Sequence, residues 1–300
     1  MKNDKLGIAL NLSFKKNKNR LIKIDIIINQ MKGRDILENV IKTTLIGLFF
    51  GTFGTTIGGI IGVKLKRTSN KFLSFILSFA SGLMTAIICF ELIPEALEVS
   101  DLFVVLLGTL LGIIMMIICD IIVDNKFRKS SITVNNFSSA DIKGKKQLGK
   151  NINKNNLLKT GIIVSIGLAI HNFPEGLAIG SGFEASIKLG LSLAIAICFH
   201  DIPEGISMAV PMKNGGMKVS KVIYYVVLSG ITTGIGALFG ALVGGISQEV
   251  IAICLAFAAG AMIYIVSGEL TPESNKLYQG RMSAIGNILG FIIGVFAMNI

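Results

Sequence analysis

Apolar runs about as long as a membrane is thick recur along the whole chain, and they limit the folds open to it. A helix needs about 20 consecutive apolar residues to cross a bilayer, and a series of such runs is the signal of membrane-spanning helices. Charged residues make up 16% of the 300-residue chain, and its mean hydropathy is +0.70. Soluble domains carry about 25% charged residues. The sequence therefore predicts an all-α integral membrane protein.

We expect eight transmembrane helices within one domain that covers residues 40–300. A polar, basic tail over 1–39 precedes this domain. A link over 124–157, rich in Lys, Asn and Ser, has the composition of a disordered cytoplasmic segment. The predicted spans are 40–63, 72–97, 102–123, 158–183, 187–211, 222–245, 249–270 and 282–300.

Both histidines of the chain stand at the same place in two related motifs, on the fourth and fifth spans. The motifs are His-Asn-Phe-Pro-Glu-Gly, which begins at His171, and His-Asp-Ile-Pro-Glu-Gly, which begins at His200. In each motif the His and the Glu are i and i+4 on a helix, so they share a face. Each Pro removes a backbone hydrogen bond inside its span. Ionisable residues in a membrane span indicate a functional site.

The spacing between the motifs predicts that the two histidines lie at the same depth, if the spans form a hairpin that turns near 184–186. Imidazole and carboxylate ligands together suit Zn²⁺ and other first-row divalent ions. Two core histidines in a proline-kinked hairpin are the alternative, but the duplication of the motif favours a metal site. The expected ligands are His171, Glu175, His200 and Glu204, with Asn172 and Asp201 beside them.

A second repeat relates the second span to the seventh. Residues 79–95 and 257–273 are identical at nine of 17 positions without a gap, and both end in Glu-Leu-x-Pro-Glu. One span is even in order and the other odd, so the two copies cross the membrane in opposite directions. This predicts an inverted repeat in a 3+2+3 arrangement, which is typical of secondary transporters with a site near the midplane.

Charge in the links predicts the orientation. The net charge of +11 comes from residues spread among the links, which argues against nucleic-acid binding. The links after spans one, three, five and seven hold almost all of the link Lys and Arg. Near the links after spans two, four and six there is only Lys188, at the start of the fifth span. By the positive-inside rule the first set is cytoplasmic and both termini lie outside. We expect a multi-pass protein of the cell membrane.

The N-terminal tail conflicts with this orientation, because it carries ten Lys and Arg through Lys42. One hypothesis is that the native protein begins at Met31, which would leave residues 1–30 dispensable or unmade. The alternative is a tail that lies on the membrane and holds anionic lipid with its lysines.

With its two Pro-Glu motifs placed on adjacent spans, the chain resembles the ZIP family (Zrt/Irt-like proteins) of divalent-metal transporters from about residue 40 to the C-terminus. The resemblance implies eight spans in a 3+2+3 layout with both termini outside. It also implies that the four His and Glu side chains are primary metal ligands. Asn172 and Asp201 match a second, adjacent metal site bridged by the two glutamates. Met84 matches a position from which the second span can lend a soft ligand, although a gap-filling core Met is equally consistent with the pattern.

The chain departs from the family pattern at the second metal site. Family members with a full two-metal site have a Glu on the sixth span, where Thr233 stands here. We therefore expect one tightly bound ion. The third link is rich in His in many members but contains none here, so a metal-sensing role for it is unsupported.

These features predict a transporter that moves Zn²⁺ into the cytoplasm, with Fe²⁺, Mn²⁺ or Cd²⁺ as possible cargo. The alternative function is a membrane-embedded metalloenzyme that uses the same ligands, but the H-E-x-x-H pattern of such enzymes is absent. We further expect contact with membrane lipid, a homodimer, and no nucleic-acid partner.

Overall fold

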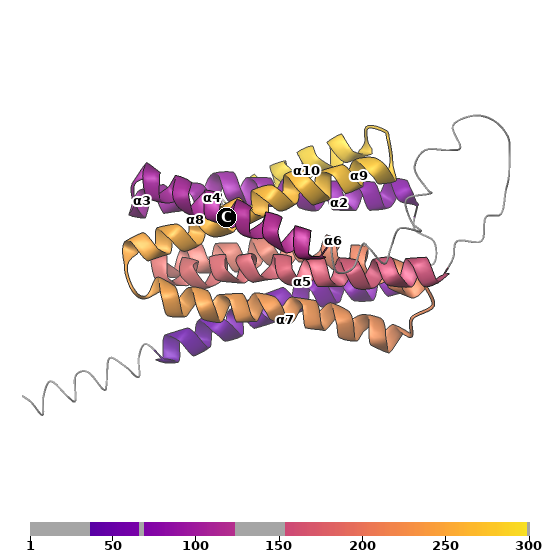
Figure 1. Cartoon of the computed structure of the whole chain (residues 1–300), viewed down its shortest axis with the longest axis horizontal. Helices are drawn as coiled ribbons and strands as arrows, with labels where there is room; N and C mark the ends of the chain where they lie inside the picture. Colours follow the sequence, from indigo (N-terminus) through magenta and orange to yellow (C-terminus); the bar gives the residue numbers. More distant parts are fainter. Residues whose placement is uncertain (1–36, 66–68, 124–153, 299–300) are drawn as a thin grey trace, which may run out of the picture. The chain divides into compact units, whose positions relative to one another are not determined.

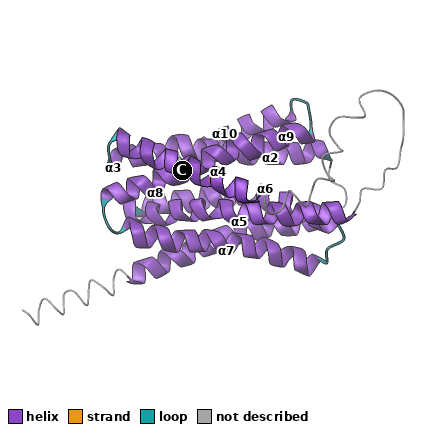
Figure 2. Cartoon of the chain, in the orientation of Figure 1, coloured by secondary structure: helices purple, strands orange, loops and turns teal. Residues whose placement is uncertain are grey.

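The computed structural model describes residues 37–65, 69–123 and 154–298, and within these ranges the chain is helical without strands (Figure 2). The expectations for the N-terminal tail over 1–39 lie outside the described residues except at its last three positions, which begin the first helix. Those for the link over 124–157 also lie outside them, apart from its last four positions. Packing is described below for residues 43–300.

The described helices follow the apolar runs closely. An unlabelled first helix, Leu37–Lys64, precedes the labelled elements of Figure 1. The others are α2 (Asn70–Ile87), η1 (Ile88–Leu92), α3 (Ile93–Val99), α4 (Leu102–Val123), α5 (Lys154–Ala185), α6 (Ile187–Asn214), α7 (Val219–Gly244), α8 (Gln248–Ile265), η4 (Val266–Leu270), α9 (Thr271–Leu277) and α10 (Met282–Met298).

Seven helical stretches of the described chain are long and apolar enough to cross a membrane, and α10 is a shorter apolar helix of 17 residues. The class predicted from composition, an all-α membrane protein, is confirmed. Helix α5 begins at Lys154, so it covers the last four positions of the expected link. The predicted turn of the hairpin lies at Ser186, whose side chain accepts a hydrogen bond from the Leu189 amide at 3.1 Å and caps α6.

The second and seventh spans each contain one turn of π-helix, at equivalent places. In η1 the Ile93 amide donates to the Ile88 carbonyl, and in η4 the Thr271 amide donates to the Val266 carbonyl. A proline follows each π-turn at the start of a new α-helix, Pro94 in α3 and Pro272 in α9. The residues before each proline are also helical, so each proline removes a backbone hydrogen bond within a continuous helix, next to a π-turn of the kind at which long helices bend.

The internal repeat extends to helix packing. A Cβ atom added at Gly82 of α2 would fall on the backbone carbonyl of Asn287 in α10, and one at Gly260 of α8 would fall on that of Thr109 in α4. Residues 79–95 align with 257–273 by a constant shift in residue number, which we call the repeat offset. The same shift relates Gly82 to Gly260 and Thr109 to Asn287. Helix α2 therefore packs on α10 through the same positions by which α8 packs on α4.

The helices beside the central hairpin also pack through glycines at equivalent positions of the repeats. A Cβ atom at Gly176 of α5 would meet the carbonyl of Thr233 in α7, and one at Gly205 of α6 would meet the carbonyl of Thr55 in the first helix. The repeat offset carries Thr55 to Thr233, and the two glycines have the same spacing as the two motif histidines. Glycine is required at these crossings because any side chain would collide with backbone.

Helices α5 and α6 pack on each other and contact α7, α8 and α2, so the hairpin that carries both motifs lies among the other helices (Figure 1). Both motif prolines, Pro174 and Pro203, lie inside these helices as predicted. This arrangement removes the motif side chains from solvent and from lipid.

Candidate metal centre

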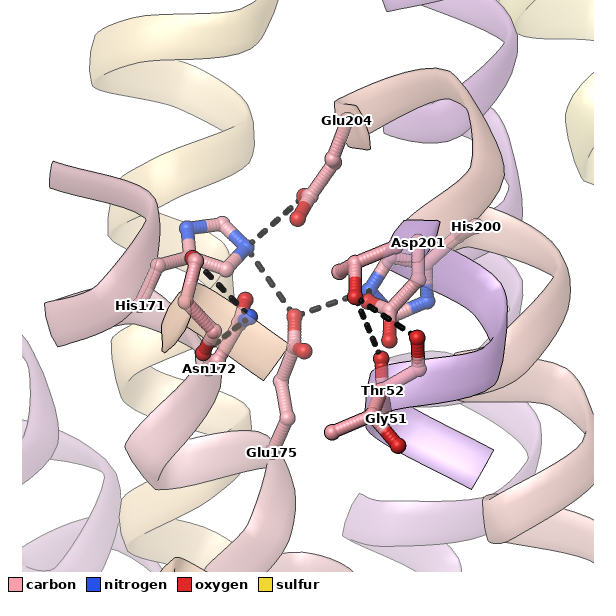
Figure 3. Close-up of polar contacts among 10 residues, drawn as sticks. Gly51, Thr52, His171, Asn172, Glu175, His200, Asp201 and Glu204 are labelled. Carbon is pink, nitrogen blue, oxygen red and sulfur yellow. Dashed lines mark hydrogen bonds and ion pairs between the residues drawn. The ribbon is translucent and has the colours of Figure 1, made fainter. Parts of the chain in front are cut away.

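The four predicted ligands meet at one point between α5 and α6. The side chains of His171, Glu175, His200 and Glu204 are all buried, and each offers a ligand atom within 4.8 Å of the others. The i, i+4 spacing brings each His over its own Glu, and the hairpin brings the two pairs together (Figure 3).

The Glu175 carboxylate is at the centre of the contacts. Its Oε1 atom lies 2.8 Å from Nε2 of His200, where it makes a hydrogen bond, and 3.0 Å from Nε2 of His171. The same His171 nitrogen lies 3.1 Å from Oε1 of Glu204 (Figure 3). The two imidazoles and the two carboxylates thus face one another from both helices.

Most polar atoms of this cluster have no hydrogen-bond partner among the described residues. No Lys or Arg pairs with the cluster among residues 37–65, 69–123 and 161–298. Leaving buried carboxylates uncompensated costs several kcal/mol per ion. A divalent cation would offset that cost, and imidazole with carboxylate is a donor set for such an ion. Some of these atoms still lie within ion-pair distance of a neighbour, as Nε2 of His171 does from Oε1 of Glu204. The atoms without a hydrogen bond are Nε2 of His171, Oε2 of Glu175, both carboxylate oxygens of Glu204 and Asp201, Oδ1 of Asn172 and Nδ1 of His200.

Asn172 is held by a residue that sequence reasoning missed. Its amide nitrogen donates to the backbone carbonyl of Ser229 in α7 at 3.1 Å and approaches the Ser229 hydroxyl at 3.4 Å. Because the nitrogen is used in this way, the amide oxygen of Asn172 remains free as a ligand. The contact joins positions far apart in the sequence, so no local pattern marks Ser229.

Asp201 lies on the other side of the centre. Its Oδ1 atom is 3.5 Å from Nε2 of His200, and the residue is fully buried. Gly54 of the first helix leaves room for it, since a Cβ atom there would lie 2.8 Å from the Cβ of Asp201. The structure thus brings all six motif side chains predicted from the sequence into or beside one buried site (Figure 3).

Comparison with known proteins shows the family of this chain. The family model described as ZIP zinc transporter matches residues 40–300. The chain belongs to the ZIP family.

Among its relatives, the zinc transporter ZupT of Clostridium perfringens is 32% identical over 277 residues, which is 88% of this chain and 97% of the relative. ZupT of Akkermansia muciniphila is 31% identical over 268 residues, or 86% of this chain and 95% of the relative. The human zinc transporter ZIP11 is 36% identical over 138 residues, 44% of this chain and 40% of the relative.

Members of the ZIP family are transporters and not enzymes, as the names of these relatives also state. The metalloenzyme alternative therefore has no support. The chain is a multi-pass membrane protein of a metal-ion transporter family.

The two further residues singled out from the ZIP resemblance lie in different surroundings. Met84 is fully buried in an apolar cluster with Leu77, Met116 and Leu270. Thr233 is also fully buried, but its hydroxyl has no partner among the described residues. The Thr233 side chain occupies the space that a side chain at Gly51 would need. The resemblance to the ZIP family implies that Thr233 stands where members with a full two-metal site have a Glu, and here the side chain packs beside Gly51.

Proposed function

We propose that this protein carries Zn²⁺ into the cytoplasm through the centre formed by His171, Glu175, His200 and Glu204. The observation that supports this most is the convergence of four buried ligand atoms within 4.8 Å, from two helices of a membrane protein. The relatives that match nearly its whole length are named zinc transporters. Fe²⁺, Mn²⁺ and Cd²⁺ fit the same donor set and are alternative cargo.

The charge of the centre supports a cargo that stays only briefly. Two imidazoles and two carboxylates neutralise a divalent ion without forming a closed thiolate shell of the kind that holds structural zinc. The ligands come from two helices, so a small separation of α5 and α6 would open the shell.

We assign Asn172 and Asp201 to a weaker, adjacent ion position. The free amide oxygen of Asn172 and the unpartnered carboxylate of Asp201 support this assignment. Thr233 offers only a neutral hydroxyl there, so we expect a single tightly bound ion. Met84 is kept as a candidate soft ligand, which would have to leave its apolar cluster in order to reach the ion.

We infer eight spans in a 3+2+3 inverted repeat, with α5 and α6 as the central pair. The recurrence of the repeat offset in sequence identity, π-turns and glycine contacts supports this arrangement. The eighth span would be α10, whose 17 residues are at the short end of the range that crosses a bilayer.

We place the protein in the cell membrane. Its orientation, with both termini outside, is inferred from the distribution of Lys and Arg among the links. Rows of exposed apolar side chains on α4 and α10 support contact with lipid and with a second copy in a homodimer. On α4 this row includes Leu106, Leu110 and Ile114, and on α10 it includes Ile288, Ile292 and Phe296.

The test is uptake by the purified full chain in sealed proteoliposomes. We expect saturable Zn²⁺ uptake that competing Cd²⁺, Fe²⁺ or Mn²⁺ reduces in the order of their affinity for the centre. Vesicles without protein provide the baseline. Uptake no greater than this baseline for every ion tested would contradict the proposal.

A further inference from the structure

Two equivalent seams of the structure differ in polarity. The first lies where α2 packs against α9 and α10, and we call it the polar seam. Its counterpart, where α8 packs against α3 and α4, is related to it by the repeat offset, and we call it the apolar seam. The two seams have the same helix crossings, with Gly82 and Gly260 at corresponding places.

Hydrogen bonds between side chains cross the polar seam at two levels. At one level the hydroxyls of Ser74 and Ser274 are 3.1 Å apart, and the Ser274 hydroxyl also donates to the Ser74 carbonyl at 2.7 Å. At the other level the hydroxyls of Ser81 and Thr271 are 3.0 Å apart, and Nδ2 of Asn287 donates to the Ser81 hydroxyl at 3.1 Å. Three helices are thus joined by hydroxyl and amide groups.

An open hollow of about 380 Å³ adjoins this network, between α9 and α10. The link that joins these two helices is drawn at the upper right of Figure 1. A hollow of this size has room for several waters, and four of its six lining residues have hydrogen-bonding side chains. It is lined by Thr271, Asn275, Ser283, Ala284, Asn287 and Ile288.

In the apolar seam, apolar side chains stand at nearly all of the positions equivalent to these polar residues. Of eight equivalent positions, seven change from a hydroxyl or amide to an apolar side chain. The exception is Thr109, whose hydroxyl donates to the carbonyl of Val105 in its own helix. The pairs, polar seam first, are Ser74 and Ala252, Ser78 and Ala256, Ser81 and Ala259, Thr271 and Ile93, Ser274 and Ala96, Asn275 and Leu97, Ser283 and Val105, and Asn287 and Thr109.

Helix packing alone does not account for this difference. Close approach requires small residues, and alanine meets that need in the apolar seam. Hydrogen bonds between helices in a membrane add only about 0.6 to 2 kcal/mol each, and the apolar seam holds the same crossing without them. The polar groups therefore supply something besides adhesion, and hydroxyls and amides exchange their mutual hydrogen bonds for bonds to water at little cost.

We propose that the polar seam is a hydrated passage, open beside the link between α9 and α10, through which the transported cation moves between the metal centre and that side of the protein. The apolar seam stays dry. The role of the cation rests on the proposed function, whereas the hydration of the seam does not. Neutral oxygens bind a divalent ion weakly, which suits a route that the ion must leave.

Met84 lies at the inner end of this passage. It is on the same turn of α2 as Ser81 and Thr85, and it belongs to an apolar cluster against which Ile170 packs. Ile170 directly precedes the ligand His171. A short apolar barrier thus separates the polar seam from the metal centre.

The first test uses the unmodified full chain and a matched pair of methionines. The repeat offset carries Met84 beside the polar seam to Met262 beside the apolar seam, and both are fully buried. Hydroxyl radicals formed from water oxidise methionine, and mass spectrometry reads each site. We expect Met84 to be oxidised on the order of ten times faster, because local opening of a polar seam exposes less apolar surface to water. Equal rates, or faster oxidation of Met262, would overturn the proposal.

The second test uses cysteine substitutions at matched positions. Ser81→Cys and Asn287→Cys are compared with Ala259→Cys and Thr109→Cys, using a methanethiosulfonate that bears a sulfonate and peptide mass spectrometry to read each site. Faster modification of the first pair is expected, together with loss of Zn²⁺ uptake after modification. Equal modification of both pairs contradicts hydration of the seam. Modification that leaves uptake unchanged contradicts its role as the cation route.

The two proposals can fail separately. Oxidation and cysteine modification do not require transport, so a dry polar seam would leave the metal centre unaffected. Conversely, if the unmodified chain takes up no metal, the proposed function fails while the accessibility measurements still report on the seam.

Discussion

At the scale of single residues, the candidate metal centre consists of side chains that satisfy one another only in part. Glu175 contacts both imidazoles, and the two carboxylate oxygens of Glu204 have no hydrogen-bond partner among the described residues. The ligands are therefore poorly satisfied in the absence of metal, and each is expected to matter for binding.

Replacement of one ligand should abolish saturable uptake. Removing a residue that only supports a metal ligand lowers metal affinity by roughly tenfold to a hundredfold. For His171→Ala or Glu204→Ala, which remove a ligand itself, we expect a larger loss of Zn²⁺ affinity. Zn²⁺ uptake and equilibrium binding measure this. Ser181→Ala is the matched control, because Ser181 is fully buried in the same helix and its hydroxyl bonds only to that helix. Normal uptake by both ligand variants would remove the centre from the mechanism.

We expect Thr233 to limit the number of tightly bound ions. Thr233→Glu should add a second tight ion, because a carboxylate then joins Asp201 and Asn172, whose free oxygens are available. Metal content after removal of excess ion gives the stoichiometry. Thr233→Gln is the control, since glutamine has nearly the same size as glutamate but carries no charge. Two equally tight ions in the unmodified protein would show that Thr233 does not limit the site.

At the scale of helices, the position of the metal ligands depends on close glycine crossings. Gly176 directly follows the ligand Glu175, and its missing side chain lets α5 rest on the carbonyl of Thr233 in α7. The equivalent contact of Gly205 with Thr55 sets the position of Glu204 in the same way. The motif glycines therefore position the carboxylates that precede them.

Alanine at Gly176 should destabilise the protein, whereas alanine at Gly167 should not. A Cβ atom at Gly176 collides with backbone, and overpacking of this kind costs about 1–3 kcal/mol. Gly167, on the same helix, has open space, so alanine there should gain about 0.5–1 kcal/mol from helix propensity. Thermal unfolding in detergent compares the two variants. Equal transition temperatures would show that α5 and α7 can separate without cost.

At the scale of the whole molecule, the distribution of basic residues and the inverted repeat predict which ends of the helices face the cytoplasm. Two glutamines at opposite ends of the seventh span allow a matched test. Gln248 is exposed at the start of α8, and Gln279 is exposed after α9.

In intact cells, an impermeant thiol reagent should label Gln248→Cys, and it should label Gln279→Cys only after the membrane is opened. Both substitutions are made with Cys89→Ser, because the native Cys89 is exposed. The same cysteine variants are made in the full chain and in a form that begins at Met31. Comparing their labelling tests whether the basic tail affects orientation. Labelling of Gln279→Cys alone in intact cells would reverse the orientation and the direction of transport.

The sequence by itself determined the class of the fold, the approximate spans and the six motif side chains that meet in the candidate metal centre. These depend on local periodicity, because an apolar run sets a span and a spacing of four residues sets a shared helix face. The hairpin between the motifs is short enough for equal depth to follow from counting residues.

Only the tertiary structure decided how each helix is rotated against its neighbours. The bond from Asn172 to Ser229, the unpartnered hydroxyl of Thr233 and the apolar surroundings of Met84 all depend on that rotation. The partners are far apart in sequence, and small residues permit close approach without specifying which faces meet. For the same reason the contrast between the polar and apolar seams emerged only when the packing aligned positions related by the repeat offset.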